Sequence, residues 1–458
     1  MENPAEHVVI IGNGISGVTA ARYIRKLSDK RITIISAETK YFFSRTALMY
    51  IYMGHMKFEQ TQPYEPWFWK KNRIDLVEDY VESVDTRSRF LKMRQGETIE
   101  YDKLIIASGS IPNKFGWPGQ DLKAVQGLYS YQDLESMEQY TEGLKRAVIV
   151  GGGLIGLEMA EMFMSRNIPV TFLVRESDYW RSVMPAEESN MISRHMIEHH
   201  VDLRLNTELK EILSDSNGKA RAVITSTGEE IQCQFVGLTA GVRPNVQFLK
   251  DSLNCDLDIQ KGVLVNDFLE TTAADVYAIG DCAQIMNPLP GRRTIEAIWY
   301  TGRMMGETVA HSICGTRTAY IPSLWFNSAK FFDIEYQVYG TVLADPLENH
   351  KQLYWEHPDG RKSIRLVFQI EKKNVIGFNL MGVRYRHEVC EKWIEEETHI
   401  EEVLQNLGIA NFDPEFYQEY EVELISAYNK QFDANLTLKK KRNFTSALRF
   451  LKRKVVGQ

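Results

Sequence analysis

Cysteine is scarce in this 458-residue chain, and its distribution excludes several kinds of site. The five cysteines are Cys233, Cys255, Cys282, Cys314 and Cys390. They are odd in number, far apart and without a Cys-x-x-Cys pair, so we expect neither a disulfide framework nor a cysteine-based zinc site. This usage of cysteine predicts a reduced, cytoplasmic protein.

Long apolar runs and an excess of positive charge are missing as well. No stretch approaches the roughly 18 uncharged apolar residues that a membrane-spanning helix needs. The N-terminus passes from Pro4 and Glu6 directly into an apolar run, without the basic region and cleavage site of a secretory signal. The net charge of −7 gives no indication of nucleic-acid binding, and the length is typical of about three domains.

What the chain does contain is two glycine-rich loops in the same local context. Each loop follows a short apolar strand and precedes a helix and a second strand. The first unit comprises strand 8–11, loop GNGISG at 12–17, helix 18–27 and strand 32–35, and the second comprises strand 147–150, loop GGGLIG at 151–156, helix 157–165 and strand 170–174. In such a loop the first glycine permits a tight turn, the second admits a pyrophosphate, and the third lets helix and strand pack closely. We therefore expect two dinucleotide sites, each at a helix N-terminus that favours negative charge.

The residue that meets the ribose should follow each loop by about 20 positions. Glu38 lies 21 residues past Gly17 and is the candidate in the first unit, although it could be a solvated loop residue. The second unit has Arg175 there, followed by Glu176. A cation suits the 2′-phosphate of NADPH, whereas NADH would want a carboxylate. The sequence favours NADPH, with Arg181 joining the clamp; alternatively, Arg175 and Glu176 form a surface ion pair.

Three further segments carry a resemblance to a known family. The segment TTAADVYAIGD at 271–281 resembles the second FAD motif of the two-dinucleotide-domain flavoproteins, which include glutathione reductase, NADH oxidase, ferredoxin reductase, rubredoxin reductase and apoptosis-inducing factor. YDKLIIASGSIP at 101–112 and FVGLTAGVRPN at 235–245 resemble the segments that lead into and out of the family's pyridine-nucleotide domain. The resemblance covers about residues 8–310 and implies that FAD is bound, with Asp281 on its ribityl chain.

The resemblance also implies a domain organisation of the α/β class. We expect two Rossmann-like domains, one for FAD and one for NAD(P)H, plus a C-terminal α+β domain. The predicted FAD domain spans 1–115 and 240–320, the NAD(P)H domain spans 116–239, and the C-terminal domain spans 321–458.

The segment at 41–50 distinguishes between branches of the family. Disulfide reductases carry a redox-active cysteine pair near this point, but no cysteine precedes Cys233 here, and thiol exchange needs a thiolate beside the flavin. The segment instead is similar to the Arg-Pro-x-Leu-Ser-Lys motif of ferredoxin reductases. Arg45 matches the arginine beside the FAD phosphates, and Tyr50 replaces the lysine near flavin N5. Glu158 matches the partner of that lysine and is expected to line the nicotinamide site, or else to be a helix-surface glutamate.

Two tryptophans and a group of histidines complete the candidates. Trp299 and Trp325 lie in segments that resemble those facing the flavin ring, where a flat aromatic would shield it; alternatively, both are core residues. His195, His199 and His200 lie on a probable helix without an accompanying carboxylate or cysteine pattern. We expect a solvated helix face there and no metal site.

The predicted contacts fall into two sets. FAD contacts are Gly12, Gly14, Ser16, Gly17, Glu38, Arg45, Val81, Ala107, Ser108, Gly109, Gly280, Asp281, Trp299 and Trp325. NAD(P)H contacts are Gly151, Gly153, Leu154, Ile155, Gly156, Glu158, Arg175, Arg181 and Gly241.

The C-terminal 20 residues form a basic tail. Residues 439–458 contain eight lysines and arginines and no acid, with Phe444, Leu448, Leu451 and Val455 on one helical face. Such a helix could lie on an anionic membrane surface, dock an acidic electron carrier, or pack on the acidic part of its own chain. The last alternative is favoured because an apolar helical stripe is usually core.

Together these features predict an FAD-dependent NAD(P)H oxidoreductase. Hydride would pass from the nicotinamide to flavin N5, and electrons would leave to a small redox protein such as ferredoxin or rubredoxin. A quinone or small oxidant is the alternative acceptor, and a flavin-based redox sensor in the manner of apoptosis-inducing factor is the alternative function. The sequence leaves open whether the protein forms a homodimer.

Overall fold

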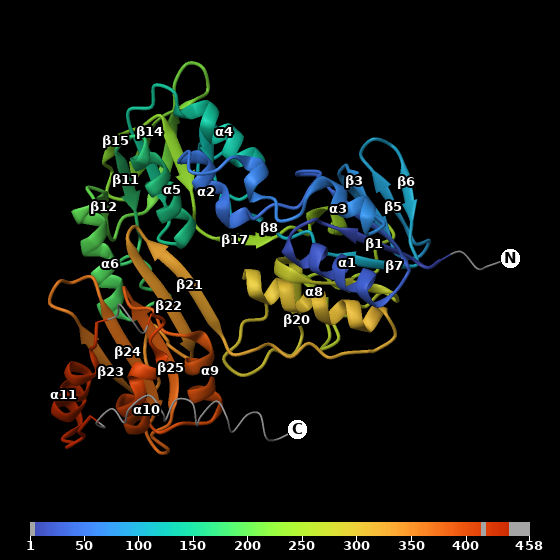
Figure 1. Cartoon of the computed structure of the whole chain (residues 1–458). Coiled ribbons are helices and arrows are strands. Elements are labelled where there is room, and N and C mark those ends of the chain that lie inside the picture. The colour runs from blue at the N-terminus through green and yellow to red at the C-terminus, as the bar shows by residue number, and fades with distance from the viewer. Residues whose placement is uncertain (1–4, 414–417, 439–458) are drawn as a thin grey trace. The chain divides into compact units, whose positions relative to one another are not determined.

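The computed structural model describes residues 5–413 and 418–438, which fall into two compact units (Figure 1). The dinucleotide unit comprises Met1–Trp180 and Met196–Ser323, and the C-terminal unit comprises Arg181–His195 and Leu324–Gln458. The first holds both glycine loops. The basic tail at 439–458 lies outside the described residues, so the three interpretations of it stay open.

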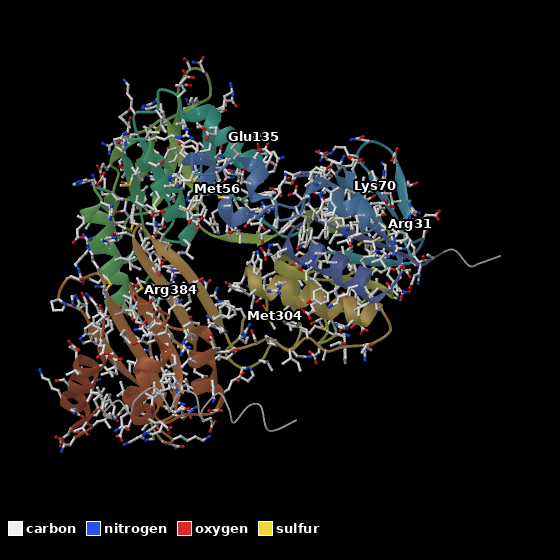
Figure 2. All side chains as sticks on the ribbon, in the orientation of Figure 1. Arg31, Met56, Lys70, Glu135, Met304 and Arg384 are labelled. Carbon is white, nitrogen blue, oxygen red and sulfur yellow. The ribbon has the colours of Figure 1, made fainter. Side chains whose placement is uncertain are left out.

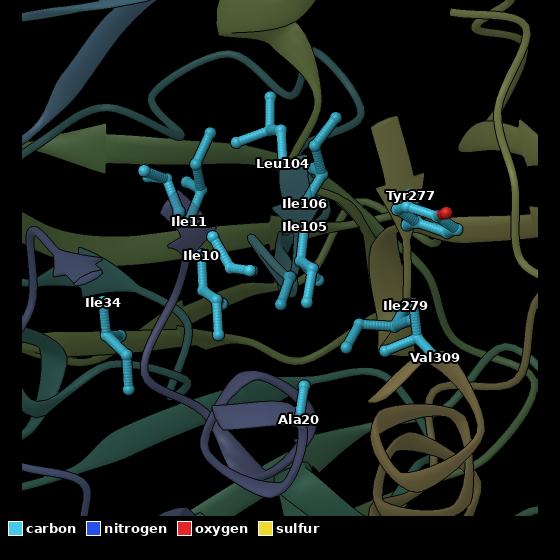
Figure 3. Close-up of a cluster of buried hydrophobic side chains, with 14 of the residues drawn as sticks. Ile10, Ile11, Ala20, Ile34, Leu104, Ile105, Ile106, Tyr277, Ile279 and Val309 are labelled. Atoms are coloured by element: carbon cyan, nitrogen blue, oxygen red, sulfur yellow. The ribbon is translucent and has the colours of Figure 1, made fainter. Parts of the chain in front are cut away.

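The first parallel sheet is built around the strand that precedes the first glycine loop. Its order is β19-β7-β1-β2-β3, and every pair in it is parallel. The strands are β1 (His7–Ile11), β2 (Arg31–Ser36), β3 (Ile74–Glu78), β7 (Lys103–Ile106) and β19 (Val276–Ala278). Both faces of β1 are covered, so Val8, Val9 and Ile10 are fully buried, and Figure 3 shows Ile10 beside Ile105 and Ile34 in this core. Continuous apolar strands of this kind are typical of parallel sheets with helices on both sides.

Two helices pack together on this sheet. They are α1 (Ile15–Leu27) and α8 (Trp299–Ile313). A Cβ at Gly306 of α8 would lie 2.5 Å from the backbone carbonyl oxygen of Ser16, so this close approach requires a glycine. Ser16 and Gly306, which are 290 positions apart, thus come together at the first glycine loop.

The second parallel sheet repeats the arrangement around the second loop. Its order is β12-β11-β10-β16-β9. The strands are β9 (Val125–Gln126), β10 (Ala147–Val150), β11 (Val170–Leu173), β12 (Asp202–Arg204) and β16 (Phe235–Leu238), and α5 (Leu154–Ser165) follows the loop. Both α1 and α5 begin three residues before the predicted starts at 18 and 157, because the end of each glycine loop already forms the first helical turn.

The chain enters and leaves this second sheet through a short ribbon. The strands β8 (Ser110–Pro112) and β17 (Val242–Pro244) pair antiparallel, with Pro112 opposite Val242. Two Rossmann-like sheets in one chain confirm the predicted α/β fold class.

The remaining elements of the dinucleotide unit are short. The helices are α2 (Leu48–Tyr52), α3 (Pro66–Lys71), α4 (Tyr131–Thr141) and α7 (Gln247–Lys250), with 3-10 turns η1 (Arg45–Ala47), η2 (Phe58–Thr61) and η3 (Gly280–Cys282). The strands are β4 (Val81–Asp85), β5 (Phe90–Met93), β6 (Thr98–Glu100), β13 (Leu209–Ser214), β14 (Ala220–Thr225), β15 (Glu230–Gln232), β18 (Val263–Val265) and β20 (Ala283–Ile285).

The C-terminal unit is an antiparallel sheet with helices, in the order β21-β22-β25-β24-β23. The strands are β21 (Phe326–Phe331), β22 (Ile334–Gly340), β23 (His350–Glu356), β24 (Ser363–Gln369) and β25 (Val375–Met381). The helices are α9 (His387–Glu395), α10 (Ile400–Asn406) and α11 (Glu421–Phe432), with η4 (Leu407–Ala410). In Figure 2, Arg384 marks the segment between β25 and α9, where its guanidinium pairs with Glu335 of β22.

The long helix α6 (Ala186–Glu198) is divided between the two units. Within the C-terminal unit, Arg365 of β24 donates to Glu188 at 2.7 Å, and both side chains are buried. The division into three domains at 115, 239 and 320 stays a prediction, since the two compact units draw the boundary elsewhere. No helix among the described residues is long and apolar enough to cross a membrane.

Candidate dinucleotide-binding sites

The first glycine loop has two closed glycines and one open glycine. Gly12 has φ +110°, and a Cβ there would overlap the carbonyl of Ala107. A Cβ at Gly17 would likewise overlap the carbonyl of Gly12. A Cβ at Gly14, in contrast, would meet nothing within 4 Å. Gly12 and Gly17 are therefore needed for packing, while the backbone at Gly14 is accessible to a ligand.

The helix that follows this loop has free donors at its start. Gly14 is the N-cap of α1, and no side chain caps it. The first N–H groups of an uncapped helix need a partner, and a phosphate supplies one in dinucleotide-binding folds. Ser16, in the first turn of α1, is buried against α8. The loop and helix thus fit the pyrophosphate of a dinucleotide.

The carboxylate of Glu38 lies two residues beyond β2 and is held by an arginine. Arg45 donates from Nη1 to Oε1 at 2.8 Å and from Nη2 to Oε2 at 2.6 Å, and the backbone N–H of Tyr131 also donates to Oε1. The Glu38 side chain is only 19% exposed, so the alternative of a solvated loop residue is wrong. Burial alone would lower the pKa of Arg45, but the hydrogen bonds and charge of Glu38 outweigh it and raise that pKa.

Asp281 reaches the same edge of the sheet from a segment more than 200 residues further along the chain. The register places Ile106 beside both Ile11 and Ala278, so the ends of β1, β7 and β19 meet. Asp281 follows β19 in η3, and its Oδ2 accepts hydrogen bonds from the Ser110 hydroxyl at 3.1 Å and the Tyr129 hydroxyl at 3.3 Å. Burial raises the pKa of Asp281, and these two hydroxyls and Arg45 oppose that shift.

The segment after β7 supplies more of this edge. The Ser108 hydroxyl donates to the carbonyl of Asn245 at 2.8 Å, which ties the two linking segments together. Gly109 and Gly280 have φ of +70° and +71°, a backbone conformation that favours glycine. Val81, the first residue of β4, is buried in the core. Their contacts with FAD, like those of Ala107, stay predictions.

The second glycine loop repeats the closed-open-closed pattern. Gly151 has φ +114°, and its Cβ would lie 2.8 Å from the carbonyl of Thr239. At Gly156 a Cβ would lie 2.6 Å from the Thr239 hydroxyl, whereas at Gly153 its nearest atom would be 3.9 Å away. The helix α5 begins at Leu154 and Ile155 with no side-chain cap. Gly241, with φ +85°, lies three residues after β16, the strand that pairs with β10.

The charges beyond the second loop are exposed. Arg175 lies two residues past β11, its side chain is 71% exposed, and its Nε donates to Glu176 at 2.8 Å. The surface ion pair that the sequence left open is therefore present. The Nη groups of Arg175 make no hydrogen bond with any described residue. Arg181 is engaged within the C-terminal unit, where it pairs with Asp345 at 2.5 Å.

Glu158 projects from α5 and is largely shielded from water. Burial raises its pKa to about 7, and the negative charge of Glu161 adds to the shift. Among the described residues, no cation contributes to this shift, in keeping with Tyr50 at the position where the ferredoxin-reductase motif has lysine. Tyr50 lies on α2 with 38% of its surface exposed and its ring stacked on His55. The alternative of a fully solvated helix-surface glutamate is not supported.

The helix α2 is fixed to its neighbours by its last residue. The Tyr52 hydroxyl lies 2.7 Å from the Thr141 hydroxyl of α4, and Arg166 stacks its guanidinium on the Tyr52 ring. Figure 2 shows Met56, just beyond α2, and Glu135 of α4 in this region. The stretch that carries Arg45 and Tyr50 is thereby anchored to the second dinucleotide fold.

The tryptophans differ in exposure. Trp299, at the first position of α8, is 40% exposed, with Arg303 6.0 Å from its ring, so its assignment to the core is wrong. Trp325 is partly buried just before β21 in the C-terminal unit, and its carbonyl accepts from Gly340. Their contacts with the flavin stay predictions. In Figure 2, Met304 marks the helix that Trp299 opens.

The histidine face of α6 is not solvated throughout, which corrects the prediction. His195 is 1% exposed, and its Nε2 lies 2.5 Å from Oδ1 of Asp333 within the C-terminal unit. The carboxylate is 138 residues away, so no local pattern could reveal it. His200 is exposed, as expected, and His199 is half-buried.

No thiol stands at the carboxyl edge of the first sheet except a buried one. All five cysteines are described and free. Cys282, next to Asp281, is fully buried and lies within hydrogen-bonding distance of the carbonyls of Ile106 and Ile279. Burial raises the pKa of its thiol, which opposes formation of a reactive thiolate.

Two residues at this site, Tyr129 and Ser110, were not predicted from the sequence. Tyr129 touches both Asp281 and Arg45, yet it lies in an ordinary-looking connection between β9 and α4. Only the juxtaposition of distant segments reveals its contacts. Ser110 was within a recognised segment, but nothing marked its hydroxyl as a partner of Asp281.

Comparisons with known proteins agree with this geometry. The family model described as pyridine nucleotide-disulphide oxidoreductase matches residues 6–308. The chain is 27% identical over 314 residues to a rubredoxin-NAD(+) reductase of Ectopseudomonas oleovorans, which covers 68% of this chain and 80% of the reductase. It is 30% identical over 349 residues to a CoA-dependent NAD(P)H sulfur oxidoreductase of Pyrococcus abyssi, covering 74% of this chain and 77% of that enzyme.

A solved structure shows the same fold. An engineered water-forming NADPH oxidase bound to NADPH, derived from the NADH oxidase of Lactobacillus brevis, superposes with a TM-score of 0.78. It is 18% identical and covers 93% of this chain and 98% of its own. The family resemblance that the sequence motifs carry is confirmed, and the chain belongs to the pyridine nucleotide-disulphide oxidoreductase family.

Proposed function

We propose that this chain is an FAD-dependent NAD(P)H oxidoreductase that passes electrons to a small redox carrier such as rubredoxin or ferredoxin. The observation that carries the proposal is the pair of glycine loops, each with an open middle glycine and an uncapped helix at the edge of its own parallel sheet. When bound, FAD supplies the chemistry that accepts a hydride from the nicotinamide and releases electrons singly. The name of the rubredoxin-NAD(+) reductase relative supports the carrier class.

The residues divide the work of binding between the two loops. The backbone from Gly12 to Gly17 would hold the FAD pyrophosphate at the start of α1. Glu38 would accept from the adenosine ribose through the lone pairs that Arg45 leaves, and Asp281 would hold the ribityl chain. The backbone from Gly151 to Gly156 would hold the pyrophosphate of the nicotinamide donor.

The donor is proposed to be NADPH. Arg175 keeps its Nη donors available at the end of β11, where a 2′-phosphate would lie. The engineered NADPH oxidase offers a parallel, since its five substitutions remove an aspartate and introduce two arginines six positions apart. Arg175 and Arg181 have the same spacing. Arg181 would have to exchange Asp345 for the phosphate.

Glu158 would face the nicotinamide in a form that depends on pH. Burial raises the pKa of Glu158 to about 7, so near neutrality its carboxyl can carry a proton and donate a hydrogen bond. Tyr50, which stands where the ferredoxin-reductase motif has a lysine, cannot supply a cation to pair with this carboxylate. Both residues are proposed to set the polarity around the reacting ring.

Thiol-disulfide chemistry is not part of the proposal. The buried Cys282 and the absence of any cysteine before Cys233 leave no thiolate for exchange at the first loop. The sulfur oxidoreductase relative makes this a point to test directly.

The decisive experiment is anaerobic reduction of the FAD-loaded protein by NADPH and by NADH, each followed by a panel of acceptors. Rubredoxin and ferredoxin should reoxidise the flavin fastest, ahead of a quinone and of coenzyme A persulfide. Flavin that neither nucleotide reduces would overturn the proposal. Faster reoxidation by the quinone would favour a quinone as the acceptor. Reoxidation by the coenzyme A persulfide would favour sulfur chemistry.

Contacts of the basic tail and of a second copy are tested separately. Removal of residues 439–458 should leave binding to anionic vesicles unchanged if the tail packs on its own chain. A loss of vesicle binding would support the membrane interpretation. A molar mass of the full chain in solution near twice that of one copy would indicate a dimer.

A further inference from the structure

The connection between β9 and α4 places one side chain at the centre of the first site. Tyr129 is seated by the start of α4, where its backbone N–H donates to Asp133 Oδ2 at 2.9 Å. The same carboxylate accepts from the N–H of Ser130, whose hydroxyl caps α4 in return. A capping box of this kind fixes the entry of a helix, so the position of the Tyr129 ring is set by its own backbone.

The phenol group faces Asp281. Its oxygen accepts from the backbone N–H of Ser110 at 3.0 Å and donates to Asp281 Oδ2 at 3.3 Å. A Cβ at Gly109 would lie 3.1 Å from this phenol oxygen, so the glycine makes the approach close. Burial, aided by the charge of Asp281, raises the pKa of Tyr129 to about 12, and the hydroxyl stays a donor at neutral pH.

The ring of the same residue faces Arg45. The Arg45 Cζ lies 4.5 Å from the ring centroid, and Arg45 Nη1 also donates to the Tyr129 carbonyl. Arg45 and Asp281 make no hydrogen bond with each other. Tyr129 therefore joins the cation on the phosphate side of the site to the carboxylate on the ribityl side.

We infer that Tyr129 is a positioning residue of the FAD site, which fixes the Asp281 carboxylate through its hydroxyl and the Arg45 guanidinium through its ring. The inference rests on the proposed function, because it assumes that FAD occupies the first loop. Both hydroxyl donors to Asp281 bind Oδ2, so Oδ1 would be the oxygen offered to the cofactor. The carboxylate is thus presented with one oxygen anchored and the other available.

The test compares two tyrosines that are two residues apart. Tyr129→Phe removes the hydroxyl and keeps the ring on Arg45. Tyr131→Phe is the matched control, because the Tyr131 hydroxyl makes no hydrogen bond with a described residue and its backbone N–H to Glu38 is retained. The measurements are the FAD dissociation constant by fluorescence, the flavin absorption spectrum and the flavin midpoint potential.

We expect Tyr129→Phe to weaken FAD binding about tenfold, in line with the loss of a hydrogen bond to a charged group. The midpoint potential should fall and the flavin spectrum should shift, since Asp281 loses a donor that tempers its negative charge. Tyr129→Leu should weaken binding further because the stack on Arg45 is lost too. Tyr131→Phe should leave affinity, spectrum and potential unchanged.

The outcomes separate the inference from the function beneath it. Wild-type protein that binds no FAD would overturn the proposed function. Wild-type protein that binds FAD, with Tyr129→Phe equal to Tyr131→Phe in affinity and potential, would overturn the inference alone. Should Tyr129→Phe not fold, Tyr129→His takes its place. The His variant must bind FAD more tightly than Tyr129→Leu by virtue of its ring N–H, and equal binding would overturn the inference.

Discussion

The two glycine loops share one backbone geometry and differ in everything that follows it. After the first loop, the acid Glu38 is shielded and held by Arg45, and Asp281 is half-buried beside Tyr129. After the second loop, Arg175 extends into solvent with a single bond to Glu176. A preorganised, shielded site suits a cofactor that stays, whereas an open site with an exposed cation suits a substrate that exchanges. The contrast indicates how one motif can serve two ligands, one retained and one exchanged.

The largest effect should come from glycines that pack rather than bind. Gly12→Ala would place a Cβ into the Ala107 carbonyl at φ +110°, so we expect a loss of about 3 kcal/mol or more in the free energy of unfolding. Gly14→Ala should leave the apoprotein unchanged and weaken FAD binding, because its Cβ points to open space. Chemical denaturation without cofactor measures both. Equal destabilisation by the two variants would contradict the division of roles.

A smaller effect should distinguish the two ion pairs. Glu38→Gln leaves the guanidinium of Arg45 without its bidentate partner in a shielded site, and we expect a loss of about 2 kcal/mol. Glu176→Gln, the matched change at the exposed pair, should cost under about 0.5 kcal/mol. Urea titrations of the apoproteins make the comparison. If Glu176→Gln cost as much as Glu38→Gln, the second site would not be open in the sense described.

The next effect concerns the choice of nucleotide. Arg175→Ala should lower the ratio of kcat/KM for NADPH to that for NADH by about tenfold, because a 2′-phosphate loses its cation. Stability should change little, since the guanidinium is exposed. The measurement is the steady-state rate with each nucleotide and the same electron carrier at one concentration. Glu176→Gln, which alters the other member of the ion pair, is measured alongside for comparison. An unchanged ratio would sink the assignment of NADPH.

The smallest effect depends on pH and on a position where the loops again differ. Glu158 lies two residues past Gly156, where the first unit has the neutral Thr19. Because the folded pKa of Glu158 is raised from 4.5 to about 7, the folded protein binds more protons than the unfolded chain in that window. Stability should therefore decrease as pH rises from about 4.5 to 7. Denaturation of the apoprotein at several pH values should show this slope, and Glu158→Gln should reduce it.

Local patterns predicted what local physics decides. The glycine spacings, the buried strands and the place of Glu38 all follow from a few neighbouring residues, and the structure agrees with them. Asp281 was reachable through a recognisable segment, although it lies far from the loop in sequence. Tyr129, the His195–Asp333 contact and the burial of Arg365 on Glu188 were not predictable, because each depends on partners that only tertiary packing brings together. The exposure of Trp299 was undecided for the same reason.

The ribbon of β8 and β17 has a consequence for how such a chain can change. Pro112 and Val242 face each other across this pair, so the 129 residues between them leave and rejoin the first fold at a single point. A segment with adjoining ends can be gained, lost or exchanged without displacing the strands on either side of the junction. The second nucleotide fold is thus an insertion in the first. Exchange of this segment for another would change the nucleotide-binding fold while leaving the first parallel sheet continuous.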